Sequence, residues 1–129
     1  MRYAAVAASA LLLAGCNGGT VDRHALTNDA ATIDSLACEG ALLAHDASKG
    51  ASTTTFVRVH SDALRAQASH LADALAERPT SPGLERRVRR ASKDAKAVAN
   101  VLSRLQHHAG DREVAARAER ALDRAGQCP

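Results

Sequence analysis

Four histidines are the residues of this chain with the clearest capacity for metal chemistry. Imidazole nitrogens, together with carboxylates such as those of Asp46 and Asp111, bind zinc, copper or nickel. On the helices expected below, the histidines gather toward one end of the molecule; they are His45, His60, His107 and His108. The spacing favours a metal site only weakly, because the chain has no His-x3-His pair, no Glu-x-x-His motif and no Cys-x-x-Cys-His motif.

The alternative to a metal site is a structural role for each histidine. A histidine in the last turn of a helix interacts favourably with the helix dipole, which suits His45, His107 and His108. His60 could form a hydrogen-bonded pair with Gln67 that sets the register of the helices in the core. Both interpretations stay open.

Charge is distributed unevenly along the chain. Residues 22–49 hold five acidic residues against two basic ones, whereas residues 81–108 hold seven basic residues against two acidic ones. Six of these cations form a run that we call the basic cluster: Arg86, Arg87, Arg89, Arg90, Lys93 and Lys96. Such a run can bind phospholipid headgroups, an anionic envelope polymer, an acidic protein or nucleic acid. The alternative is a solvated helix face, partly balanced by the acidic segment.

Catalytic motifs are missing from the 129 residues. There is no Gly-rich phosphate loop, no Gly-x-Ser-x-Gly elbow and no convincing pair of carboxylates, so we predict that the protein is not an enzyme. Aromatic residues make up only 2% of the chain and tryptophan is absent, which argues against aromatic-lined carbohydrate sites and base-stacking surfaces. With 46% hydrophobic and 24% charged residues, the composition fits one folded domain.

The first sixteen residues have the design of an export signal. Met1-Arg2 gives a positive start, an uncharged apolar run follows, and Leu13-Ala14-Gly15-Cys16 ends it with small residues before a cysteine. These four residues resemble the lipobox of bacterial lipoproteins. The resemblance implies cleavage before Cys16 and a diacylglycerol thioether on Cys16. The alternative is an ordinary leader with an unmodified Cys16.

The resemblance also sets the expected location. Acyl chains such as palmitate on Cys16 would anchor the protein to the cell envelope without a transmembrane helix. Asn17 follows the cysteine, and in bacteria with two membranes the absence of aspartate there implies the outer membrane, facing the periplasm. We expect no contact with nucleic acid, because the leader exports the protein away from it.

Two cysteines remain after lipidation, and an oxidising compartment favours a disulfide between Cys38 and Cys128. Catalysis by a cysteine is the alternative, but no feature marks a reactive thiol. In a regular bundle the two residues would miss each other by roughly 10 Å at a rise of ~1.5 Å per residue. Either the tail turns back, the helices are staggered, or the expected helix boundaries are displaced.

Helical periodicity organises the rest of the chain. After a signal peptide (1–15) and a lipidated flexible tether (16–27), we expect one domain over 28–129. The first helix is predicted from an N-cap at Asn28 to about 49, with helices following at about 53–78, from about 81 to 110, and from 111 to about 125. The residues predicted to face inward are, in the first helix, Ile33, Leu36, Gly40, Leu43 and Ala44; in the second, Val57, His60, Leu64, Gln67, Leu71 and Ala74 or Leu75; in the third, Leu84, Val88, Ala91, Ala95, Val98, Leu102 and Leu105; and in the fourth, Val114, Ala118, Ala121 and Ala125.

Four amphipathic segments joined by short loops predict an all-α protein, a small antiparallel up-down-up-down four-helix bundle. The expected function is that of a lipid-anchored, non-catalytic interaction or structural module in the cell envelope. Its expected partners are the membrane and an anionic lipid, polymer or envelope protein. Two alternatives are a periplasmic metal-binding or metal-sensing bundle and an immunity or inhibitor lipoprotein.

Overall fold

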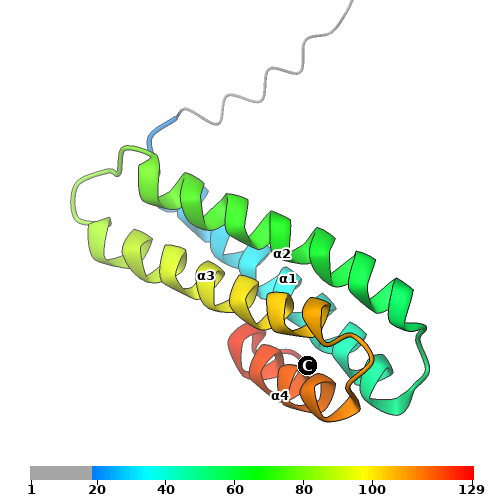
Figure 1. Cartoon of the computed structure of the whole chain (residues 1–129). Helices are drawn as coiled ribbons and strands as arrows, with labels where there is room; N and C mark the ends of the chain where they lie inside the picture. Colours follow the sequence, from blue (N-terminus) through cyan, green and yellow to red (C-terminus); the bar gives the residue numbers. More distant parts are fainter. Residues whose placement is uncertain (1–18) are drawn as a thin grey trace, which may run out of the picture.

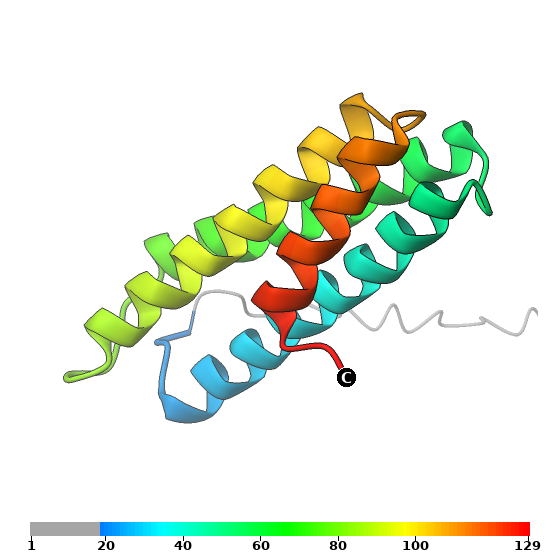
Figure 2. The same ribbon diagram turned by 90° about the horizontal axis from the view of Figure 1, so that it is seen from below.

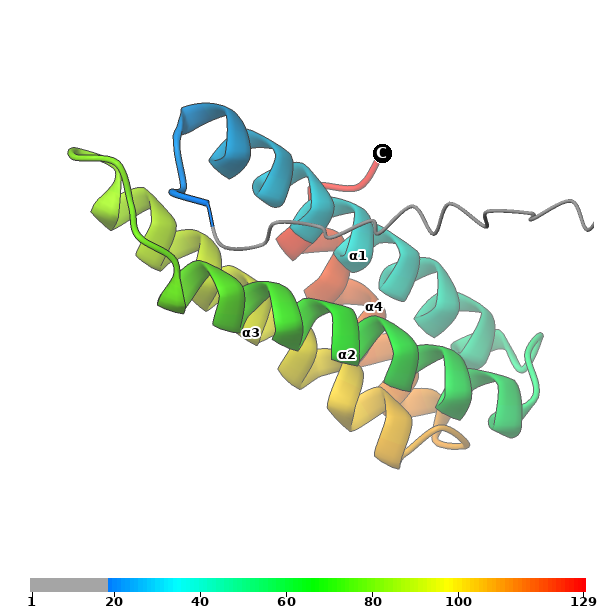
Figure 3. The same cartoon turned by 90° about the horizontal axis from the view of Figure 1, so that it is seen from above.

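The structure, a computed structural model, describes residues 19–129 and confirms an all-α four-helix bundle (Figure 1). The helices are α1 (Arg23–Lys49), α2 (Thr54–Glu77), α3 (Glu85–His107) and α4 (Arg112–Gly126). The chain reverses direction at each short connection in Figures 1 and 3. None of the helices in the described range is long and apolar enough to cross a membrane.

Helix α1 begins six residues earlier than the sequence predicted. Its N-cap is Asp22, whose carboxylate accepts a hydrogen bond from the Ala25 amide at 2.8 Å, so the expected cap at Asn28 is wrong. Leu26 is buried and extends the apolar face of α1 by two turns beyond Ile33. Gly50 ends the helix in the left-handed conformation, at φ 70°, close to the expected end.

The segment before α1 is also fixed to the bundle. Val21 is fully buried and pairs with Thr80 in an isolated parallel β-bridge, in which the Val21 amide donates to the Pro79 carbonyl at 2.7 Å. The Ser81 amide in turn donates to the Val21 carbonyl at 3.0 Å. Residues 19–27 are therefore not the flexible tether that their small, polar composition predicted, because Val21 and Leu26 join the core.

The four helices pair unequally. Helix α2 packs most extensively on α3, and α1 on α4, while α1 also touches α2 and α3; α2 and α4 make no contact with each other. Figure 2 shows the short α4 lying against α1 and α3, with the C-terminal tail leaving toward α1. Seen from above in Figure 3, residues 19–22, drawn in blue, lie between the start of α1 and the end of α2.

The predicted inward faces of α1 and α3 are confirmed. All five residues predicted to face inward in α1 are buried, and so are six of the seven predicted for α3. The seventh, Leu84, is half-buried. In α2 the prediction is partly wrong: Val57, Leu64 and Leu75 are buried, but Gln67 is exposed and His60 half-exposed. The remaining inward places of α2 are taken by small residues, namely Ser61, Ala68 and Ala72. The expected core pair of His60 and Gln67 is therefore not formed.

The inward face of α4 is displaced from the predicted one. Ala118 is buried as predicted, whereas Val114 and Ala121 are half-buried and Ala125 is exposed. The other buried residues are Ala115, Leu122 and Gly126. Leu122 is fully buried and is the largest apolar side chain that α4 contributes, so its burial sets the rotation of the helix.

Two glycines permit the close approach of α4 to α1. A Cβ placed on Gly126 would lie 2.7 Å from the Cys38 sulfur and 2.9 Å from the Asp34 carbonyl oxygen. A Cβ on Gly40 would lie 2.9 Å from a methyl carbon of Leu102 and 3.1 Å from one of Leu122. Small residues at these crossings let the helix axes approach more closely than larger side chains allow.

Candidate functional site

The basic cluster occupies the solvent side of the first half of α3. Because Val88, Ala91 and Ala95 face the core, the six cations fall on the rest of the helix surface, and all of them are exposed. The same outward line continues to Arg104 near the end of α3, which is also exposed. The six cations named from the sequence are therefore all exposed on one helix, with Arg104 farther along it.

No member of the basic cluster forms an ion pair within residues 19–129. The cations that do form pairs there lie elsewhere: Arg65 with Asp62, Arg78 with Asp29, and Arg117 with Glu113. Asp34 of α1 faces the cluster across a shallow groove without pairing with it. The acidic first helix thus lies near the cluster, but it does not neutralise the cations by direct contact.

The cluster divides between two grooves. Arg86, Arg87 and Arg90 line a groove of about 720 Å³ between α1 and α3, together with the acidic side chains of Asp34 and Asp94. This α1–α3 groove therefore carries nearly balanced charge.

The second groove, of about 660 Å³, lies between α2 and α3 and is lined by Arg89, Lys93 and Lys96. It also receives Arg78, against a single acidic residue, Glu85, and its apolar floor includes Leu75 and Val88. This α2–α3 groove is the more cationic of the two.

Arg78 is a residue of this region that the sequence prediction missed. Its guanidinium donates through Nε to the Gly19 carbonyl at 3.1 Å and lies 3.4 Å from the Asp29 carboxylate. Arg78 thus joins the α2–α3 groove to the segment where the chain enters the bundle. The only sequence signal was its position beside Pro79, at the end of a predicted helix.

The histidines take separate partners. His45 Nδ1 lies 2.9 Å from a carboxylate oxygen of Glu119 on α4, and His60 Nε2 lies 2.8 Å from one of Glu39 on α1. The His60 ring also stacks on Phe56, with ring centroids 5.4 Å apart. Each of these two imidazoles is therefore already engaged with a glutamate from another helix.

The other two histidines lie at the end of α3. His107 Nδ1 lies 2.7 Å from the Ser103 carbonyl oxygen, and His108 is the C-cap residue, as favoured for histidine at helix C-termini. Within residues 19–129, no three or more His, Cys, Asp or Glu side chains form a group able to hold a metal ion. The structure thus does not bring the four predicted ligands into one site.

Asp111 caps α4 rather than joining a metal site. Its carboxylate accepts hydrogen bonds from the Glu113 and Val114 amides at 2.9 and 3.1 Å. The hydrogen bond from Val114 is the main reason that the pKa of Asp111 lies below its ordinary value, with further lowering from Glu113, Arg117 and His108.

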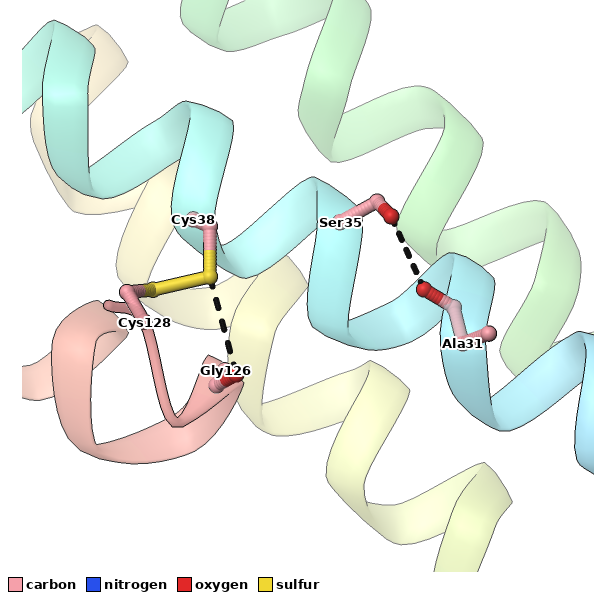
Figure 4. The surroundings of a disulfide bond; sticks show 5 residues. All are labelled: Ala31, Ser35, Cys38, Gly126 and Cys128. Carbon is pink, nitrogen blue, oxygen red and sulfur yellow. Dashed lines mark hydrogen bonds between the residues drawn. A yellow bond between two sulfur atoms is a disulfide. The ribbon is translucent and has the colours of Figure 1, made fainter.

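The two cysteines form the predicted disulfide (Figure 4). The Cα atoms of Cys38 and Cys128 are 5.5 Å apart. Of the possibilities left open by the sequence, the tail turns back: α4 ends at Gly126, and Gln127 adopts a left-handed conformation that brings Cys128 to α1. With both thiols oxidised in this bond, neither is a free nucleophile.

The predicted lipidation site at Cys16 lies outside the described residues, and so does the signal peptide. Comparison with protein-family models, with curated proteins and with solved structures found no match to this chain. Function must therefore be argued from the sequence and from the surfaces described above.

Proposed function

We propose that this protein is a lipid-anchored protein of the bacterial cell envelope and that its bundle is a non-catalytic interaction module. The proposed anchor is a diacylated Cys16, on the evidence of Leu13-Ala14-Gly15-Cys16 and the short apolar run before it. The proposed binding surface is the basic cluster on α3, and its partner carries negative charge.

One observation carries the second part of the proposal: six neighbouring cations are exposed and form no ion pair within the described range. Like charges held together on a helix repel one another, and an anionic partner relieves that repulsion while gaining attraction to each cation. A cluster paired with acidic neighbours would offer much less to such a partner.

The anchor is tested by localisation. Cells fed a clickable palmitate analogue should label the wild-type chain, and the label should follow the membrane fraction. The Cys16→Ala variant should lose both label and membrane association, whereas Cys38→Ala/Cys128→Ala should keep both. Recovery of the chain in the cytosol with Met1 still in place would overturn the proposal.

The interaction is tested by crosslinking in intact cells, followed by mass spectrometry of the crosslinked proteins and lipids. The variant Arg86→Gln/Arg90→Gln/Lys93→Gln should lose its main crosslinked species. A matched variant with the same loss of charge elsewhere, Arg58→Gln/Arg120→Gln/Arg124→Gln, should retain it. Equal crosslinking by all three forms, or robust hydrolase or redox turnover by the purified mature protein, would contradict the proposed role.

A further inference from the structure

Few residues separate the proposed anchor, Cys16, from the first residue that the bundle holds, Gly19. The Gly19 carbonyl accepts a hydrogen bond from the guanidinium of Arg78. The backbone of Val21 forms hydrogen bonds with Pro79 and Ser81, the residues on either side of Thr80. Only Asn17 and Gly18 separate Cys16 from Gly19, so the Cα atoms of Cys16 and Gly19 are at most about 11 Å apart at ~3.6 Å per residue. The sequence had predicted a spacer of eleven residues, 17–27.

That limit decides how far the bundle can stand from a membrane. Acyl chains on Cys16 place this residue at the bilayer interface, and one headgroup layer is about 5 to 8 Å thick. Gly19 then lies at or just beyond the outer edge of the headgroups. The end of α2 and the start of α3 cannot leave the zone in which lipid charge acts, since the Debye length is about 8 Å at physiological ionic strength.

The surface beside this exit is the α2–α3 groove. Arg78 and Thr80, which hold Gly19 and Val21, both line it, and Arg89, Lys93 and Lys96 line the same groove farther along α3. From Arg89 to Lys96 the cations cover about 10 Å of helix at ~1.5 Å per residue. Glu85 is the single acidic side chain in the lining.

We infer that the α2–α3 groove is a docking surface for the anionic phospholipid headgroups of the membrane that holds Cys16. This inference rests on the proposed lipid anchor and specifies the anionic partner. The groove has the required charge, because three of its cations are exposed and form no ion pair in the described chain. The short connection between Cys16 and Gly19 keeps the groove beside the lipid. A soluble polymer or acidic protein would have no such enforced proximity.

The orientation follows from the same geometry. With the groove against the headgroups, the outward side of α3 lies along the membrane. Helix α4, which makes no contact with α2, faces away from it. The more balanced α1–α3 groove, with Asp34 and Asp94 beside its arginines, is the weaker candidate for lipid contact.

The test uses the mature, acylated protein reconstituted into vesicles and spin-labelled at one new cysteine. Ala76→Cys places the label in the lining of the α2–α3 groove, and Ala125→Cys places it at an exposed position of α4 as the control. Accessibility to a water-soluble nickel chelate is compared between phosphatidylcholine vesicles and vesicles in which about a third of the lipid is phosphatidylglycerol. The mass of the N-terminal peptide reports acylation of Cys16 separately.

The label at Ala76 should be shielded in the anionic vesicles, and the one at Ala125 should not. The variant Arg89→Gln/Lys93→Gln/Lys96→Gln should lower the ratio of shielded to accessible protein by at least about tenfold, since each cation near the surface contributes roughly fivefold. The matched variant Arg58→Gln/Arg120→Gln/Arg124→Gln should retain the shielding.

Equal accessibility of Ala76 in both vesicle types would overturn the inference while leaving the lipid anchor intact. Equal losses in the two triple variants would also overturn it, because net charge and not the groove would then be responsible. An unmodified Cys16 would instead defeat the proposed function itself. Binding to an acidic envelope protein, with no shielding by vesicles, would assign the groove to that partner and reject the membrane.

Discussion

Val21 and Thr80 form a parallel β-bridge that ties the segment before α1 to the connection between α2 and α3. The two residues are far apart in the sequence, and the bridge is closed by hydrogen bonds of the Val21 backbone to Pro79 and Ser81. The bridge fixes where the chain enters the bundle. It also places that entry beside the cations of the α2–α3 groove.

Replacing the Val21 side chain should loosen this entry. Val21→Ala removes two methyl groups from a fully buried position, at an expected cost of about 2 kcal/mol in the free energy of unfolding. Denaturant unfolding gives the stability, and hydrogen exchange of the Ser81 amide reports the bridge. Val59→Ala, at a side chain that is 66% exposed, is the control and should change the stability by less than about 0.5 kcal/mol. If the Ser81 amide exchanges at the same rate in Val21→Ala as in the wild type, burial of the Val21 side chain does not hold the bridge, and the prediction is wrong.

The disulfide should be a main source of stability. It joins residues 90 apart, and the chain-entropy model gives about 4.6 kcal/mol for a loop of that length. Chemical unfolding with and without reductant, and of Cys38→Ser/Cys128→Ser, measures the loss. Alkylation of the exported protein under denaturing, non-reducing conditions is the direct check, and labelling of both cysteines would show that the bond is absent in the cell.

The contact of α4 with α1 should not tolerate a larger residue at its closest point. Gly126→Ala directs a Cβ at the Cys38 sulfur and the Asp34 carbonyl oxygen, and backbone cannot move aside as a flexible side chain can. We expect a loss of about 2 kcal/mol in the free energy of unfolding. Gly110→Ala is the matched control, because its nearest neighbour, the Thr54 hydroxyl, lies at an ordinary 3.5 Å. Equal stabilities of the two variants would mean that α4 lies farther from α1 than described.

The cap of α4 should respond to acid. The pKa of Asp111 lies below its ordinary value of 3.8, so its contribution to stability is complete above that pH and is lost as the pH falls through the lower pKa of the folded state. Asp111→Asn keeps a good capping side chain that does not titrate. The melting temperature of the wild type should therefore fall relative to that of this variant as the pH is lowered below 3.8. Parallel curves for the two proteins over that range would show that the Asp111 carboxylate does not stabilise α4.

The inward faces of α1 and α3 were predictable because most of their large apolar residues recur on one face, with Leu42 of α1, which is 64% exposed, as an exception. In α3, Val88, Val98 and Leu102 repeat at helical spacing, and charged residues exclude every other face from the core. The location of the basic cluster followed from the same pattern. The pairing of Cys38 with Cys128 followed from elimination once Cys16 was assigned to lipid.

The buried faces of α2 and α4 were not predictable in the same way. The chain has 24 alanines in residues 16–129, and in these two helices alanine occurs on several faces with little difference in hydrophobicity between them. The tertiary structure buries Ala68 and Ala72 in place of Gln67, because small residues permit close packing of α2 on α3, while the predicted Leu71 is half-buried against the core. It selects Leu122 in α4 for its larger buried area.

The sequence by itself determined the helical class, the residues of the basic cluster and the cysteine pair, because periodicity, charge and cysteine count are local properties of the chain. Only the tertiary structure decided that residues 19–22 pack onto the bundle. Val21 is a lone apolar residue in a small, polar segment, and its burial depends on Pro79, Thr80 and Ser81, which are remote in sequence. That long-range contact places residues 19–22, which their composition had assigned to a flexible tether, on the bundle.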